Sequence, residues 1–255
     1  MIKRILLLSL IGVSFSVSSQ TIITDRPDQT ESSSTVPKGS FQLETAVLVG
    51  FVDDETNSER QLLLPSTLFR ISLTGAIELR VLSQFESLKN GLTDETTSGI
   101  SDIEIGAKVQ LLKQEKINTE IAFLSHLIVP TGSKNITLDK FGTINKLSIS
   151  HAIDEKIGVG YNIGYNYFGD GTGDFTYSLA LGFGITDKLT VYFEPYGEFV
   201  EFKTHVSNVD AGVTYLIKKN LQLDFSFGTG INHTMNYMAI GCSINISKVP
   251  ETYKL

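Results

Sequence analysis

The sequence predicts an all-β fold, a transmembrane up-and-down antiparallel β-barrel of about 12 strands. Three observations lead to this class: large apolar residues alternate with small polar ones, short turns alternate with longer polar loops, and the chain holds 22 glycines, many inside strand-like stretches. Successive side chains of a β-strand point to opposite faces, so the first pattern describes strands with two chemically different faces. In a water-filled membrane barrel the apolar face meets lipid and the small polar face lines the lumen.

The alternation is clearest over residues 156–186. Odd positions from 157 to 167 are large and apolar or aromatic, and the even positions between them are glycine or asparagine. After the turn GDGTGD, residues 175–185 repeat the scheme with Thr, Ser, Ala and Gly on the small face. Similar patterning predicts twelve strands, at about 40–51, 60–73, 76–87, 100–112, 117–129, 141–153, 156–168, 174–186, 188–200, 205–217, 220–230 and 236–247.

The connections between these strands are of two kinds. Short turns are expected at 74–75, 113–116, 154–155, 186–187 and 218–220, and longer polar loops at 52–59, 88–99, 130–140, 169–173, 201–204 and 231–235. Short periplasmic turns and longer external loops are typical of bacterial outer-membrane barrels. Twelve strands about 4.8 Å apart and tilted by about 40° give a radius on the order of 12 Å, which predicts a narrow channel.

A soluble sandwich or lipocalin-like barrel is the alternative for the fold. It would bury the apolar face and turn the glycines toward water, where a strand glycine costs conformational entropy and packs against nothing. Small residues that line a lumen leave space for water and allow the sheet to bend. The sequence therefore favours the membrane barrel.

The chain divides into four parts. Residues 1–19 have a basic start, a short apolar stretch and small residues before position 20, which is the pattern of a signal peptide and predicts export to the bacterial outer membrane. Residues 20–38 are polar and lack periodicity, residues 39–248 form the predicted barrel, and residues 249–255 form a C-terminal tail.

Composition excludes several functional classes. The chain carries 28 acidic against 21 basic residues and has no basic cluster, which argues against nucleic-acid binding. A single cysteine and four scattered histidines supply no metal-ligand spacing, so we expect no metal and no cofactor. The expected partners are outer-membrane lipid or lipopolysaccharide and a small-molecule solute. The oligomeric state is left open.

The inner face of the predicted barrel carries many charges. Two interpretations fit this pattern: a solvated lumen whose charges have no further role, and a pathway whose charges select the solute. Parity assigns to the lumen Glu44, Arg70, Glu78, Arg80, Asp102, Glu104, Lys108, Glu120, Glu194, Asp210 and Asp224.

Residues 20–38 invite a more specific hypothesis, because Asp25, Arg26, Asp28 and Glu31 place charges of both signs in a segment without strand character. At roughly 3.3 Å per residue the segment is long enough to reach through the barrel. We expect it to fold back as a plug, with Arg26 meeting an acid such as Glu44, Glu78 or Asp224 and its acids meeting Arg70 or Arg80. A disordered leader is the alternative.

An enzymatic reading rests on His205 and Ser207, which share the outward face of one strand. A lipid-facing His and Ser with a nearby Asn would suit an outer-membrane lipid hydrolase. Asn220 is expected at the opposite end of the next strand, whereas Asn232 lies in a loop closer to His205. We therefore expect no enzyme and no catalytic residue, and keep a lipid-modifying hydrolase and a purely structural barrel as alternatives.

Several segments resemble the MetA-pathway of phenol degradation family of exported proteins. They are TDRPDQTES from Thr24, VPKGSFQLET from Val36, SGISDIEIGAKVQLL from Ser98 and PTGS from Pro130. The resemblance implies an outer-membrane barrel that acts as a transporter, with some members tied to aromatic-hydrocarbon catabolism as uptake channels. It carries over no functional residue. The chain departs from typical outer-membrane barrels by continuing past its last strand with VPETYKL. The predicted function is a channel for passive uptake of a small solute, hydrophobic or aromatic in character.

Overall fold

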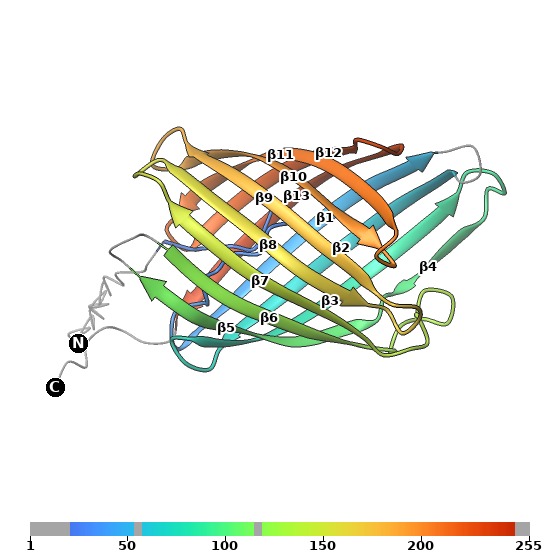
Figure 1. Cartoon of the computed structure of the whole chain (residues 1–255), viewed down its shortest axis with the longest axis horizontal. Helices are drawn as coiled ribbons and strands as arrows, with labels where there is room; N and C mark the ends of the chain where they lie inside the picture. Colours follow the sequence, from blue (N-terminus) through green and yellow to red (C-terminus); the bar gives the residue numbers. More distant parts are fainter. Residues whose placement is uncertain (1–20, 54–57, 115–118, 248–255) are drawn as a thin grey trace, which may run out of the picture.

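The computed structural model describes residues 21–53, 58–114 and 119–247. Apart from residues 21–39, these form a single antiparallel sheet that closes on itself (Figure 1). Its strands are β1 (Ser40–Asp53), β2 (Ser58–Ser72), β3 (Ile77–Asn90), β4 (Thr96–Ile100), β5 (Ile103–Gln114), β6 (Thr119–Val129), β7 (Gly142–Ala152), β8 (Ile157–Tyr167), β9 (Asp174–Gly184), β10 (Leu189–Val200), β11 (Thr204–Lys218), β12 (Leu221–Gly230) and β13 (Met235–Ser247).

Consecutive strands pair with each other, except β4 and β5, and β1 closes the barrel by pairing with β13 from Ser40↔Ser247 to Val52↔Met235. β4 and β5 both pair with β3 and together act as one strand. The barrel wall therefore has twelve staves, each of them a single strand except for the one formed by β4 and β5. The predicted fold class is confirmed. Closure pairs the strands on both sides, except along the outer edge of β4, which pairs with β3 alone.

The strand expected at 100–112 begins earlier and is interrupted. Ser101 and Asp102 leave the ladder between β4 and β5, and the loop 130–141 lies beside β4 instead of β6. There Ser133 N donates to Ile100 O at 2.8 Å, and Ile100 N donates to Ser133 Oγ at 3.0 Å. The two-residue alternation of side chains could not predict this break, because the break depends on a loop that is distant in the sequence and that takes the place of a strand partner.

β2 contains a bulge that explains its irregular alternation. The register shifts between Leu63 and Ser66, and Pro65, which has no N–H to donate, lies within the shift. Leu62 pairs opposite the outward Val49, whereas Leu63 pairs opposite Leu48 on the inward side. The run of three leucines therefore crosses from one face of the sheet to the other.

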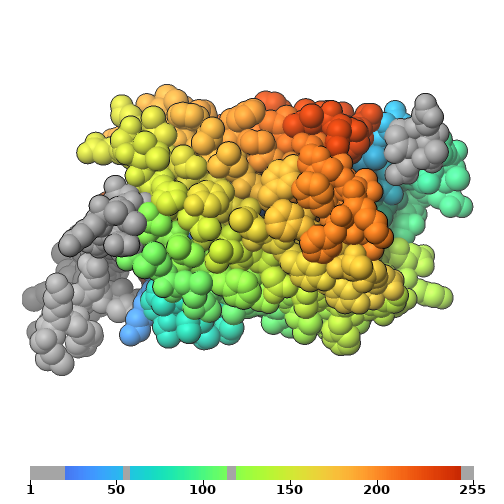
Figure 2. Space-filling model, in the orientation of Figure 1, coloured from blue at the N-terminus to red at the C-terminus, as the bar shows by residue number. Residues whose placement is uncertain are grey.

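The two faces of the barrel differ as the alternation predicts. Figure 2 shows one side, where the side chains of β7 to β11 form a continuous outer surface. Large apolar residues are exposed there and all round the barrel, including Phe123, Leu127, Ile163, Leu179, Phe193, Phe225 and Ile240. Polar and charged side chains are instead buried inside. No helix in the described part of the chain is long and apolar enough to cross a membrane.

Turn lengths distinguish the two ends of the barrel. Among the described residues, one end carries only short turns, at 73–76, 153–156, 185–188 and 219–220. The other end carries the longer loops 91–95, 130–141 and 168–173, together with two short connections at 201–203 and 231–234. Half of the expected turn at 113–116 and the middle of the expected loop at 52–59 fall outside the described residues, as do the expected signal peptide and the C-terminal tail.

Candidate functional site

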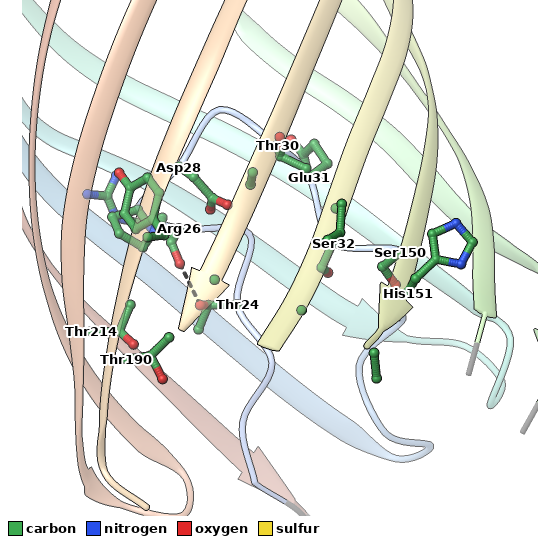
Figure 3. A pocket seen from close by; sticks show the side chains of 18 residues that line it. Thr24, Arg26, Asp28, Thr30, Glu31, Ser32, Ser150, His151, Thr190 and Thr214 are labelled. Carbon is green, nitrogen blue, oxygen red and sulfur yellow. Dashed lines mark hydrogen bonds between the residues drawn. The ribbon is translucent and has the colours of Figure 1, made fainter. Parts of the chain in front are cut away.

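Residues 21–39 run inside the barrel near the end that carries the short turns (Figures 1 and 3). Ile22 N donates to the Lys219 carbonyl in the turn between β11 and β12 at 2.7 Å, and Thr30, Ser33 and Val36 are buried. A buried segment outside the sheet must satisfy its polar groups by other means. Here the side chains of the barrel wall do so.

Asp25 lies at the centre of a buried ionic cluster. Its carboxylate is 2.5 Å from Arg80 Nη1, 2.8 Å from Lys108 Nζ and 3.2 Å from Arg70 Nη1. Burial by itself would raise the pKa of the Asp25 carboxyl, but Arg70, Lys108 and Arg80 hold that pKa well below its ordinary range. Asp25 is therefore ionised inside the barrel.

The wall on this side of the lumen has an excess of positive charge. Arg70 and Arg80 are directly opposite each other on β2 and β3, a like-charge pairing that is unfavourable by itself. Wall acids offset part of it, because Glu44 is 2.8 Å from Arg70 and Glu78 is 2.9 Å from both arginines. With Lys108, three cations face two wall acids.

The N-terminal segment supplies the missing negative charge. Glu31 is 2.8 Å from Arg80 Nη2 and, like Asp25, reaches the cluster from residues 21–39. Val36 N also donates to Glu78 at 2.7 Å. With Asp25 and Glu31, four acids surround the three cations of the wall formed by β1, β2, β3 and β5, so the segment replaces an excess of one positive charge by an excess of one negative charge.

The opposite wall is acidic and receives the donors of the segment. Arg26 Nη2 is 3.0 Å from Asp224 on β12. Of the acids expected to meet Arg26, which were Glu44, Glu78 and Asp224, this is the one that it contacts. Glu194 on β10 accepts from Gln29 N at 2.7 Å and from Thr30 Oγ1 at 2.5 Å. The charge of the lumen therefore changes sign from one wall to the other, and the segment matches both.

Uncharged polar residues of the wall complete the contacts. Asn162 Oδ1 accepts from Glu31 N at 2.7 Å, Ser178 shares a 2.7 Å hydrogen bond with Thr30, and Ser150 bonds to Ser33. Charge alone does not single out these uncharged residues among those of the inner face. Their inward parity was the available signal.

We call the bonds of residues 29–31 to Asn162, Ser178 and Glu194 the latch. It separates two cavities. The turn-side cavity, of about 370 Å³ and on the side of the short turns, is bounded by Asp28, Pro27 and the glycine-rich inner faces of β8 and β9 (Figure 3). The loop-side cavity, of about 220 Å³, is bounded by Gln29 and by polar residues of β7 to β11.

Asp28 lies against the larger cavity near the latch. Burial within the lumen, followed by the nearby negative charge of Glu194, raises the pKa of Asp28 well above its usual range. Asp25 and Asp28 are only three positions apart, yet opposite walls shift their pKa values in opposite directions.

Two further residues expected in the lumen, Glu120 and Glu104, have particular roles. Glu120 is half-buried and accepts from Ser34 Oγ at 2.5 Å. Glu104 bonds to His126 Nδ1 at 2.8 Å, and His126 Nε2 accepts from Arg80 at 3.0 Å, so Arg80 and Glu104 are connected through the imidazole.

Asp102 was expected to line the lumen, but its carboxylate accepts bonds from Gly132 N, Thr137 Oγ1 and Leu138 N. It therefore anchors the loop 130–141. Parity missed this role because Asp102 lies in the break between β4 and β5, where strand alternation does not apply.

The side chains around His205 make contacts that differ from those of a catalytic triad. His205 Nε2 bonds to Tyr177 OH at 2.7 Å, and its ring stacks on Phe199 with centroids 4.7 Å apart. The side-chain amide of Asn232 bonds to backbone groups: it donates to His205 O and accepts from Ser207 N. Over residues 21–53, 58–114 and 119–247, no three His, Cys, Asp or Glu side chains are grouped to hold a metal ion.

A closed antiparallel barrel with an apolar exterior and a charged lumen defines the class of outer-membrane β-barrels. Within it, the chain belongs to the family described as Putative MetA-pathway of phenol degradation, whose model matches residues 24–246. No curated protein matches the sequence.

Solved structures share the fold at low sequence identity. One is an outer membrane channel from Pseudomonas putida F1, with 12% identity, a TM-score of 0.69 and coverage of 84% of this chain and 97% of that chain. The KdgM porin in complex with disordered oligogalacturonate matches with 10% identity, a TM-score of 0.55 and coverage of 80% and 98%. The NanC porin matches with 10% identity, a TM-score of 0.50 and coverage of 78% and 98%.

Proposed function

We propose that this chain is a passive channel of the bacterial outer membrane, which carries a small solute and performs no chemistry on it. The observation that carries the proposal is the pair of lumenal cavities on either side of the latch, inside a barrel whose exterior is apolar. A structural barrel needs no space in its interior, whereas a transport path needs space on both sides of any constriction.

Family membership and the shared fold support this role. The fold is common to an outer membrane channel and to porins, and the family is named for phenol degradation. An aromatic compound is therefore the first candidate for the solute. The outward apolar side chains would contact outer-membrane lipid or lipopolysaccharide.

We further propose that residues 20–38 act as the plug of this channel. Asp25, Arg26 and Glu31 would hold it through their ion pairs with the wall, and Asp28 would tune its stability with pH. The latch residues lie between the two cavities. Passage then requires the segment to shift or withdraw.

Planar-bilayer recordings test both parts of the proposal. The full chain should show low conductance, and a variant that lacks residues Asp25 to Thr35 should show a larger single-channel conductance. Heat-modifiable migration on gels would verify that the variant is a folded barrel. No conductance from the folded deletion variant would overturn the channel, and equal conductance of both proteins would overturn the plug.

A phospholipase assay on the same samples covers the enzymatic alternative. We expect no hydrolysis from the full chain or from a Ser207→Ala variant. Hydrolysis that disappears in Ser207→Ala would instead establish a lipid-modifying hydrolase.

A further inference from the structure

The carboxylate of Asp25 occupies a place in the barrel wall that three cations form together. Arg70, Arg80 and Lys108 come from β2, β3 and β5 and converge on its two oxygens. We call these three residues the cation triad. Once the N-terminal segment has withdrawn, the two wall acids beside the triad offset two of its three charges and leave one positive charge in excess. A single carboxylate matches this arrangement in charge and in hydrogen bonding.

The N-terminal segment itself covers the triad, whose three side chains are fully buried. Its backbone carbonyls add to the cover, because Arg70 donates to Ile23 O at 3.2 Å and to Ser34 O at 3.0 Å. Lys108 Nζ likewise donates to Ser32 O at 2.9 Å. The triad can therefore take a ligand from the lumen only when the segment moves away, as the proposed plug must do during passage.

Apolar side chains lie beside the triad, on the side of the longer loops. Leu68 on β2 and Leu82 on β3 are directly opposite each other, two residues nearer the loops than the two arginines, and both are half-buried. Leu124 on β6 is directly opposite the lysine. Residues two apart on a strand, and residues opposite each other on neighbouring strands, share a face of the sheet. A ligand whose carboxylate meets the triad therefore has leucines beside it for an apolar body.

We propose that the cation triad is a binding subsite for a small monocarboxylate with an apolar body, aromatic or aliphatic, and that Asp25 takes the place of this ligand while the segment is docked. The inference rests on the proposed plug and adds the chemical class of the solute. It also makes the solute a competitor of the segment. A ligand that binds only the withdrawn state shifts the equilibrium toward that state, so the solute promotes opening of its own path.

Calorimetric titration of the full chain with Asp25→Ala, solubilised in detergent at neutral pH, tests the subsite without relying on transport. This variant leaves the triad without its internal carboxylate. Benzoate, hexanoate or both should bind saturably, and the comparison of the two identifies the apolar body. Benzyl alcohol, which lacks the charge, should bind at least about ten-fold more weakly. Acetate, which lacks the apolar body, should bind about five-fold more weakly.

A second substitution in the Asp25→Ala background locates the binding. Lys108→Met removes one cation and should weaken binding of the carboxylate by about ten-fold or more. Lys113→Met is the matched control, because Lys113 is also on β5 but is largely exposed and pairs with Glu120 near the short turns. Its affinity should be unchanged. Should Lys108→Met fail to form a heat-modifiable barrel, Leu82→Asn leaves every charge in place and should weaken binding of benzoate or hexanoate but not of acetate.

Proteolysis of the unmodified chain tests the competition between solute and segment. The sodium salt of the carboxylate that binds best should raise the cleavage rate within residues 21–39 by at least about three-fold at saturation. Sodium chloride at equal ionic strength and benzyl alcohol should leave the rate unchanged. An unchanged rate with the carboxylate would overturn the competition that the proposal requires.

The remaining outcomes separate this inference from the proposed function. Absence of binding for every carboxylate, equal affinity for benzyl alcohol, or equal affinities of the Lys108→Met and Lys113→Met variants would overturn the subsite. A barrel that conducts ions but shows any of these results loses the subsite and keeps the channel. A barrel that binds the carboxylate as described but never conducts, even without residues Asp25 to Thr35, keeps the subsite and loses the channel.

Discussion

Lys108 Nζ donates to both carboxylate oxygens of Asp25, each at 2.8 Å, although 83 residues separate the two in the sequence. Both side chains are almost completely buried. The contact joins a barrel strand to a segment that belongs to no strand. It shows how the lumen and residues 21–39 depend on each other, since neither set of charges is balanced alone.

Replacement of Asp25 by asparagine should release the segment. The change removes the carboxylate that contacts Arg70, Arg80 and Lys108, and removal of one partner of a buried ion pair typically costs about 3–5 kcal/mol. The barrel can relieve this cost by admitting water as the segment withdraws. We expect higher conductance in planar bilayers and faster proteolysis within residues 21–39.

Asp94→Asn provides the matched control for that experiment. Asp94 pairs with Lys89 in an exposed loop, so the same chemical change occurs far from the lumen. Conductance and proteolysis of this variant should equal those of the unmodified chain. Unchanged behaviour of Asp25→Asn would contradict the anchoring role of this residue.

Thr30→Val should weaken the latch while it preserves the shape of the side chain. The hydroxyl of Thr30 bonds to Glu194 at 2.5 Å and to Ser178 at 2.7 Å, and a hydrogen bond to a charged group contributes about 1.5–3 kcal/mol. The open fraction in single-channel recordings should therefore rise roughly ten-fold or more. Thr35→Val serves as control, since Thr35 donates to Gly75 O in a turn. Similar gating in both variants would refute the latch.

Conductance should increase with pH through the range in which Asp28 titrates. The pKa of Asp28 is raised in the lumen by burial and by Glu194, with smaller contributions from Asp210 and Asp25. The docked segment consequently binds more protons than a withdrawn one, so docking is most stable at low pH. It weakens as pH rises from the ordinary aspartate pKa toward the raised one.

Asp25 has the opposite effect on the pH dependence of docking. Because its pKa is lowered in the lumen, Asp25 stabilises the docked segment at higher pH, and this stabilisation is lost as pH falls through the lowered pKa. Recordings across pH for the unmodified chain and for Asp28→Asn would separate the two contributions. The Asp28→Asn profile should be flatter over the mildly acidic range. A profile as steep as that of the unmodified chain would assign the pH dependence to other groups.

Single cysteines should report the orientation of the barrel. In a Cys242→Ala background, Lys134→Cys in the loop 130–141 should react with a membrane-impermeant maleimide on intact cells. Asp187→Cys in the short turn 185–188 should react only after the outer membrane is permeabilised. The reverse pattern would place the short turns outside the cell.

Many features of the fold could be predicted from local sequence. Alternation in residues 157–167 and 175–185 predicted β8 and β9 within one or two residues, because the side-chain period of a strand is visible in every short window. The spacing of polar loops likewise predicted twelve staves in the right order. The same parity assigned Glu44, Glu78 and Glu194 to the inner face, and all three side chains are buried.

Local sequence could not predict which of these charges would meet. The positions of Arg70, Arg80 and Lys108 side by side depend on strand register across three staves and on the bulge at Pro65. The break at Ser101 and Asp102 depends on a loop about thirty residues later, which takes the place of a strand partner. Such contacts arise only after the sheet has closed.

The sequence by itself determined a barrel with an apolar exterior and a polar interior, since two-residue periodicity and hydrophobicity act locally along every strand. The tertiary structure decided that the lumen has a cationic wall on β2, β3 and β5 and an acidic wall on β10 to β12, with residues 21–39 between them. The physical reason is that electrostatic balance in a buried space depends on distances between atoms. Barrel closure sets those distances for residues that are far apart in the chain.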